Sequence, residues 1–264
     1  MEPVYGTVIS LVRTGFRACG WRIEVQGAQH IPRAGPAVLA SNHIGYLDFT
    51  FVGYGARARR RVVRFLAKQE IFDKRGVGWL MRKMRHIPVD RYGRAVEAFG
   101  AAVKSLKQGE LVGMFPESTI SRSFVPMAGK TGAVRMAMAA DVPLIPCVVW
   151  GSQRLLTKGR RRNLQRGVAI VVAFGEPLAY QPDEEPVEVT KRLMARIADL
   201  LEAAQADYPQ QPASDADRWW LPAHLGGTAP TVAEADALTA RESAERRARR
   251  RAAAKQINNG GKAS

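Results

Sequence analysis

The sequence has few cysteines, few acidic residues and no long apolar run. Only two cysteines, Cys19 and Cys147, occur in 264 residues, which excludes a disulfide scaffold and is typical of a reducing compartment. No segment reaches the about 18 uncharged apolar residues that a membrane-spanning helix needs. Arg13 and Arg17 interrupt the apolar residues near the N-terminus, so this segment does not have the pattern of a signal peptide.

The shortage of acidic residues leaves a large positive charge. Against 24 Asp and Glu stand 40 Lys and Arg, for a formal charge of +16. Residues 57–94 carry +10 of this charge and residues 241–255 carry +5. Such an excess predicts an anionic partner: nucleic acid, an anionic membrane surface or a phosphorylated small molecule. The hydrophobic content of 46% is ordinary for a chain with a buried core and excludes wholesale disorder.

An amphipathic helix is predicted over residues 1–20. The apolar residues that recur there at helical spacing are Tyr5, Val8, Ile9, Val12 and Phe16. Such a helix either lies on a membrane or packs on the domain. Trp21 and the basic flank of the helix favour the membrane.

Residues 21–204 are predicted to form one α/β domain. Short runs of Val, Ile and Leu alternate with segments of helical pattern. The runs are Trp21–Val25, Ala37–Ala40, Val62–Ala67, Leu111–Phe115, Leu144–Val149 and Val168–Phe174, and the helical segments are 77–84, 94–107, 130–139 and 187–204. Because the runs show little strict alternation, we expect a mixed, mostly buried sheet with helices on both faces. Residues 205–264 change in composition, and we expect a basic, partly disordered C-terminal extension.

The densest functional pattern is Ser41-Asn42-His43-Ile44-Gly45-Tyr46-Leu47-Asp48, directly after a predicted strand. Residues five apart on one continuous helix point away from each other. We therefore expect a turn through Gly45, with Asp48 in the first turn of the next helix, where a carboxylate is favoured. Asp48 then holds one ring nitrogen of His43, and the pair is a general base for a hydroxyl. The alternative is a structural histidine bonded to a helix start.

A second polar cluster follows the predicted strand Leu111–Phe115. Its members are Glu117, Ser118, Thr119, Ser121 and Arg122. Ser118 is not a nucleophile of the G-x-S-x-G type, because Pro116 and Ile120 replace both glycines. The cluster is a candidate binding site at the end of a buried strand.

Four blocks, in this order, resemble the 1-acylglycerol-3-phosphate acyltransferases, a family within the glycerolipid acyltransferases. The blocks are Asn42 with His43–Asp48, then Ala67-Lys68 through Gly76-Val77-Gly78-Trp79 to Ile87-Pro88-Val89-Asp90-Arg91, then Phe115-Pro116-Glu117-Ser118-Thr119, and last Val142-Pro143-Leu144-Ile145-Pro146. The resemblance extends over about residues 22–178 and implies the glycerolipid acyltransferase fold.

The resemblance implies acyl transfer from acyl-CoA or acyl carrier protein to the free hydroxyl of 1-acyl-glycerol-3-phosphate, giving phosphatidic acid. It implies His43 as the base, Asp48 as its orienting carboxylate, and neither a covalent acyl-enzyme nor a metal or other cofactor. The implied substrate-binding candidates are Lys68, Arg91, Glu117, Ser118, Thr119 and Arg122.

Two positions depart from the family pattern. Ser118 stands where glycine is usual, and Ile120 stands where a phosphate-binding arginine is common. Arg122 is the first candidate to replace that arginine, because a guanidinium grips a phosphate with two parallel hydrogen bonds. Lys68 and Arg91 of the second block are further candidates.

Other functions stay open at this point. The same chemistry would serve glycerol-3-phosphate, another lysophospholipid or a glycolipid as acceptor. A basic, non-enzymatic protein that binds nucleic acid or lipid is a more distant alternative, and we expect no nucleic-acid partner because no such fold pattern accompanies the arginine runs. We expect a peripheral protein at the cytoplasmic face of the cell membrane, with the acyl donor, lysophosphatidic acid and the anionic membrane surface as partners.

Overall fold

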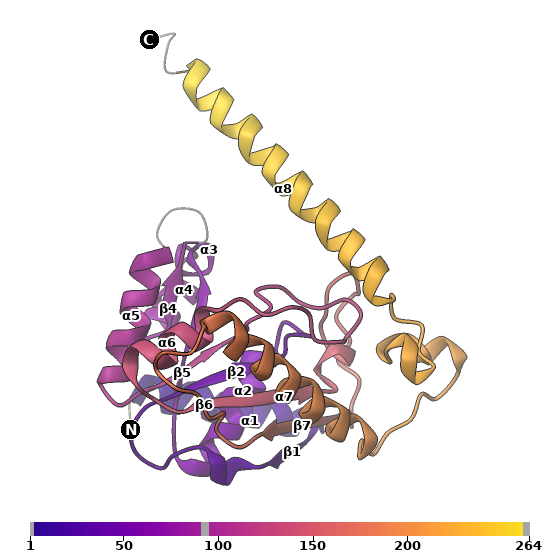
Figure 1. The fold of residues 1–264 in the computed structure, drawn as a ribbon. Helices are drawn as coiled ribbons and strands as arrows, with labels where there is room; N and C mark the ends of the chain where they lie inside the picture. The colour runs from indigo at the N-terminus through magenta and orange to yellow at the C-terminus, as the bar shows by residue number, and fades with distance from the viewer. Residues whose placement is uncertain (1–2, 91–94, 261–264) are drawn as a thin grey trace. The chain divides into compact units, whose positions relative to one another are not determined.

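The protein is described by a computed structural model over residues 3–90 and 95–260. Its contacts divide the chain into two compact units. The first comprises Met1–Ser121 and Pro126–Pro212, and the second comprises Arg122–Val125 and Ala213–Ser264. Figure 1 shows the order of the helices and strands in each.

The first unit is built on a mixed sheet, which for the described residues has seven strands in the order β1-β7-β6-β2-β5-β3-β4. The strands are β1 (Arg22–Gln26), β2 (Ala37–Ser41), β3 (Val63–Lys68), β4 (Ile87–Val89), β5 (Leu111–Met114), β6 (Leu144–Trp150) and β7 (Ala169–Phe174). Neighbouring strands run parallel, and β6 and β7 form the antiparallel pair. The predicted mixed α/β sheet is confirmed. The sequence did not reveal β4, because three residues with a central proline have no strand pattern.

Helices cover the sheet on both faces. They are α1 (Pro3–Ala18), α2 (Asp48–Ala56), α3 (Gln69–Phe72), α4 (Val77–Lys83), α5 (Ala95–Lys107), α6 (Gly132–Ala140) and α7 (Pro186–Ala206). On one face, Phe51 of α2 packs in a cluster with Leu39 and the other side chains of β2 that point the same way. The alternate β2 residues Val38 and Ala40 are also fully buried, so the opposite face is covered too. There α5, α6 and α7 contact β5, β2 and β6 (Figure 1).

α1 packs on the first unit through one of its faces. Its Tyr5 hydroxyl donates to the Val63 carbonyl at 2.9 Å, and the Phe16 ring stacks on Phe51 with centroids 5.0 Å apart. The outer face is largely polar, with Leu11 as an apolar residue that is 67% exposed. The helix therefore packs on the domain, and membrane contact through its outer face stays a prediction.

The second unit contains two short 3₁₀ helices (Asp215–Trp220 and Ala223–Leu225) and α8 (Val232–Gly260). The Trp220 side chain is fully buried, while the described side chains in the arginine-rich part of α8 are mostly exposed. The charged residues of α8 are distributed around all sides of the helix, so α8 has no apolar stripe that could pack into a core. Among the helices of the described residues, none is both long enough and apolar enough to cross a bilayer.

Candidate active site

The first and third sequence blocks meet at the carboxyl edge of the sheet. β2 and β5 are parallel neighbours, with Ala40 paired to Met114. His43 and Glu117 each follow this pair by three residues and are therefore level with each other. β3 lies on the other side of β5, so Lys68, the last residue of β3, is at the same edge. Loops at this edge are where α/β sheets present binding and catalytic groups.

The Asp48 carboxylate is fully buried and is the centre of the turn that follows β2. Its Oδ2 atom accepts hydrogen bonds from the Ile44 and Gly45 backbone N–H groups, both at 2.8 Å, and from His43 Nδ1 at 2.9 Å. Its Oδ1 atom accepts a hydrogen bond from the Ser152 hydroxyl. Asp48 is the first residue of α2, so the predicted turn and helix start are both present. Four donors stabilise the charge of this buried carboxylate.

The His43 ring is held on two sides and has a side-chain exposure of 20%. Because an ionised carboxylate only accepts hydrogen bonds, the 2.9 Å contact with Asp48 assigns the ring hydrogen to Nδ1. The Nε2 atom is then the proton acceptor. The Phe115 ring stacks on the imidazole with centroids 4.2 Å apart and planes 21° apart. The ring therefore presents a basic nitrogen in one fixed orientation.

Asn42 anchors the residue before His43. Its fully buried side chain donates to the Val149 carbonyl at 3.1 Å and accepts from the Val149 N–H at 2.8 Å. The amide thus replaces a backbone partner and extends the pairing of β2 with β6 by one residue. This explains in physical terms why the first block includes Asn42.

Glu117 ties the third block to the backbone of His43. Its Oε1 atom accepts from the His43 N–H at 2.8 Å, and its Oε2 atom accepts from the Met127 N–H at 3.0 Å. Burial raises the pKa of Glu117 to about 8; these two N–H groups lower the pKa, and the Asp48 charge raises it further. Glu117 thus holds the His43 loop in position through a hydrogen bond. Its raised pKa favours the neutral form of its carboxyl group.

Ser118 and Ile120 show what the departures from the family pattern mean. Ser118 has φ +59°, a left-handed conformation that glycine adopts without strain, so the usual glycine fits the backbone here. The Ile120 side chain is buried, with 2% exposure, and adds no charge to the site. Between them, the Thr119 hydroxyl accepts a hydrogen bond from Lys158 Nζ.

The segment Gly151–Lys158, directly after β6, was missed by the sequence analysis. Besides the bond from Ser152 to Asp48, its Thr157 hydroxyl donates to the Ile44 carbonyl at 2.6 Å. Its Leu156 carbonyl accepts from the Tyr46 N–H at 2.9 Å. These residues form no motif, and they reach the site because β6 is the neighbour of β2. Topology, and not spacing along the chain, brings them there.

Arg91 and Arg122 are two of the cationic residues predicted to bind phosphate. Arg91 lies outside the described residues. Arg122 belongs to the second unit, where its guanidinium is 3.5 Å from the Glu242 carboxylate of α8. Phosphate binding by either residue stays a prediction. Within residues 3–90 and 95–260, no group of three or more His, Cys, Asp or Glu side chains is placed to hold a metal ion.

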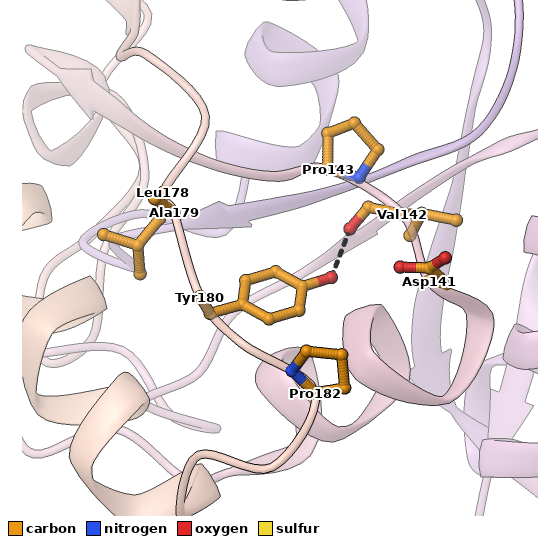
Figure 2. A pocket seen from close by; sticks show the side chains of 7 residues that line it. All are labelled: Asp141, Val142, Pro143, Leu178, Ala179, Tyr180 and Pro182. Carbon is orange, nitrogen blue, oxygen red and sulfur yellow. Dashed lines mark hydrogen bonds between the residues drawn. The ribbon is translucent and has the colours of Figure 1, made fainter.

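A surface pocket of about 270 Å³ lies at the end of the sheet opposite to His43. It is lined by Asp141, Val142, Pro143, Leu178, Ala179, Tyr180 and Pro182 (Figure 2). The pocket is next to the start of β6, whereas His43 follows the end of β2. These two strands are parallel, with Val38 paired to Leu144, so the pocket is separate from the candidate active site.

Comparisons with known proteins agree on one family. A family model described as Acyltransferase matches residues 22–150. A 1-acyl-sn-glycerol-3-phosphate acyltransferase of Bacillus subtilis is 29% identical over 187 residues, which are 67% of this chain and 87% of that protein. The 1-acyl-sn-glycerol-3-phosphate acyltransferase alpha of Bos taurus is 32% identical over 171 residues, 63% of this chain and 58% of that protein.

A solved structure agrees with the sequence comparisons. The crystal structure of the 1-acyl-sn-glycerophosphate (LPA) acyltransferase PlsC from Thermotoga maritima matches with a TM-score of 0.62 and 25% identity, and the match covers 77% of this chain and 82% of that one. The family model, the named relatives and the solved fold thus support an acyltransferase. Within that class, the chain is similar to the 1-acyl-sn-glycerol-3-phosphate acyltransferases, as its four sequence blocks predict.

Proposed function

We propose that this protein transfers an acyl group from a thioester donor, acyl-CoA or acyl carrier protein, to the free hydroxyl of 1-acyl-glycerol-3-phosphate, giving phosphatidic acid. The observation that carries the proposal is the buried Asp48 carboxylate bound to Nδ1 of a partly exposed His43. The names of the Bacillus and bovine relatives support the choice of acceptor.

The geometry supports direct transfer with His43 as the base. Nε2 of His43 takes the proton of the acceptor hydroxyl while the hydroxyl oxygen forms a bond to the thioester carbonyl carbon. The carbon–sulfur bond then breaks, and the proton on Nε2 passes to the departing sulfur, so the products are an ester and a free thiol. Asp48 stabilises the imidazolium that exists between these two proton transfers.

A membrane-facing surface is supported by exposed apolar residues on α4 and at the start of α2. Val77 and Trp79 of α4 are 49% and 53% exposed, and Tyr46 and Phe49, which flank the start of α2, are 48% and 37% exposed. Exposed tryptophan and tyrosine side chains suit the boundary between water and lipid. A peripheral position at the cytoplasmic face of the cell membrane would bring the site to its lipid acceptor.

A different acceptor is the second candidate, and the buried Ile120 favours it because no cation occupies that position of the third block. Glycerol-3-phosphate, another lysophospholipid and a glycolipid would all offer a hydroxyl to the same base.

A thiol-release assay with acyl-CoA across a panel of acceptors tests the proposal. The panel contains lysophosphatidic acid, glycerol-3-phosphate, lysophosphatidylcholine and monoacylglycerol, and mass spectrometry identifies the acylated product. The proposal predicts the highest kcat/KM with lysophosphatidic acid. Highest turnover with another acceptor would overturn the assignment of the acceptor and keep the acyl transfer.

A further inference from the structure

The third block is hydrogen-bonded to the backbone of His43 on both sides of Thr119. Glu117 accepts the N–H of His43, and the Ser121 N–H donates to the His43 carbonyl at 2.8 Å. Thr119 is two residues from each of these contacts, a span of at most about 7 Å between Cα atoms. Thr119 is therefore at a place where the third block is bonded on both sides to the backbone of His43.

Lys158 brings a positive charge to this place. Its Nζ atom donates to the Thr119 hydroxyl, and its side chain is half-buried. The residue before it, Thr157, is bonded to the Ile44 carbonyl of the His43 loop at 2.6 Å. The backbone that carries Lys158 is thus attached to the catalytic loop, and its ammonium group is attached to the third block.

The charges around the base require such a cation if the acceptor carries a phosphate monoester. The buried Asp48 carboxylate contacts the His43 ring, and Ile120 of the third block is neutral. A phosphate close to this carboxylate needs a positive group nearby. An ammonium group has three N–H donors, and the Thr119 hydroxyl, which accepts from Lys158, keeps its own hydrogen to donate.

We infer that Lys158 and the Thr119 hydroxyl bind the phosphate monoester of the acceptor and so select phosphorylated acceptors. This inference rests on the proposed function. It assigns the phosphate to a residue outside the four sequence blocks and beyond residues 22–150, the range of the family model.

Two matched ligands test the inference by isothermal titration: soluble 1-hexanoyl-glycerol-3-phosphate and 1-hexanoyl-glycerol, which lacks the phosphate. Lys158→Met removes the charge at nearly constant length. We expect it to weaken binding of the phosphorylated ligand about 10- to 100-fold, as for a hydrogen bond to a charged group, and to leave binding of the neutral ligand unchanged. Lys158→Arg should restore most of the difference. Lys191→Met, at an exposed lysine of α7, is the matched control.

Two results would overturn the inference: phosphate-specific binding by Lys158→Met equal to that of the wild type, or equal losses for both ligands, which would indicate a structural role. Thr119→Val removes the hydroxyl that accepts from Lys158 and keeps the positive charge of Lys158. This variant should therefore lose less selectivity for the phosphorylated ligand than Lys158→Met does. A rise in KM for acyl-CoA with unchanged KM for the acceptor would assign Lys158 to the donor's phosphates and contradict the inference. Failure of the proposed function would look different: the wild type would bind the phosphorylated ligand and release no thiol from either acyl-CoA or acylated acyl carrier protein.

Discussion

The orientation of His43 depends on single residues that come from three separate parts of the chain. Asp48 belongs to the same turn, Phe115 and Glu117 follow β5, and Ser152 follows β6. Because a general base must meet its proton within hydrogen-bonding distance, small displacements of the ring reduce the rate strongly. The positioning residues should therefore affect turnover more than they affect substrate binding.

Ser152→Ala tests this expectation. The variant removes one of the four donors to the Asp48 carboxylate and leaves the other three in place. We expect kcat to fall about 10- to 100-fold, with little change in KM for the acceptor. Steady-state kinetics measure both parameters. The matched control is Ser10→Ala, because the Ser10 hydroxyl contacts a backbone carbonyl of α1 on the exposed face; a loss of kcat of the same size in this control would contradict the role of Ser152.

Glu117 predicts a pH dependence of stability. Burial raises its folded-state pKa to about 8 from an ordinary value of 4.5. A group with a raised pKa contributes stability that is fully present below the unfolded-state pKa and is lost as the pH rises through the folded-state pKa. The free energy of unfolding of the wild type, measured relative to that of Glu117→Gln, should thus decrease between about pH 5 and pH 8. Urea denaturation at several pH values measures this difference; a constant or increasing difference would contradict a raised pKa.

At the residue scale, the sequence predicted the arrangement of His43 and Asp48 because their spacing allows contact only through a turn. It did not predict Ser152, Thr157 or Lys158. Serine, threonine and lysine are common at surfaces and in loops, and their contacts here depend on the adjacency of β6 and β2. No local pattern contains this information.

At the scale of elements, α4 and the residues around it combine apolar and basic exposed groups. Val77 and Trp79 point to solvent, and Lys74, Arg75 and Lys83 beside them are exposed as well. α1 contacts α4, but its outer face has few apolar side chains. We therefore propose α4 as a candidate for membrane contact beside the N-terminal helix, whose contact with a membrane stays a prediction.

Trp79→Ala tests the role of α4. Loss of the indole should weaken binding to phosphatidylglycerol vesicles about tenfold or more, which corresponds to the about 1.5–3 kcal/mol gained when a large apolar side chain is buried. Vesicle sedimentation measures the binding. Leu164→Ala, at a leucine that is 61% exposed, is the matched control. Equal binding by the wild type and Trp79→Ala would contradict a membrane contact through α4.

Apolar runs allowed β1, β2, β3, β5, β6 and β7 to be predicted, since buried strands of a covered sheet are nearly continuous in Val, Ile and Leu. β4 was missed because its pairing with β3, in which Pro88 is opposite Ala67, is a tertiary property. Residues 232–260, part of the extension in which we expected partial disorder, are helical as α8.

At the scale of the whole molecule, part of the basic charge has a structural use. In residues 57–94, Arg59 donates to the Ile31 carbonyl, Arg61 donates to the carbonyls of Pro32, Gly35 and Gly109, and the buried Arg64 pairs with Glu110. These arginines satisfy backbone carbonyls and a buried carboxylate. The exposed cations beside α4 are the better candidates for binding to anionic lipid.

The triple variant Lys74→Ala, Arg75→Ala and Lys83→Ala tests this division of charge. Each cation near an anionic membrane contributes about 1 kcal/mol, so binding to phosphatidylglycerol vesicles at low salt should weaken about 100-fold. The wild type should also bind less as salt rises, because salt screens exposed charges over about 8 Å at physiological ionic strength. Vesicles of neutral phosphatidylcholine are the control. Wild-type binding that is independent of salt would contradict an electrostatic contribution.

We propose that His43, oriented by Asp48, is the base that activates the acceptor hydroxyl. The most direct measurement compares thiol release from acyl-CoA with lysophosphatidic acid for the wild type and His43→Ala, after circular dichroism and thermal unfolding have shown that both are folded. General base catalysis contributes about 10²- to 10⁴-fold, so we expect His43→Ala to lose at least about 100-fold in kcat. A folded His43→Ala variant that retains most of the wild-type turnover would contradict it.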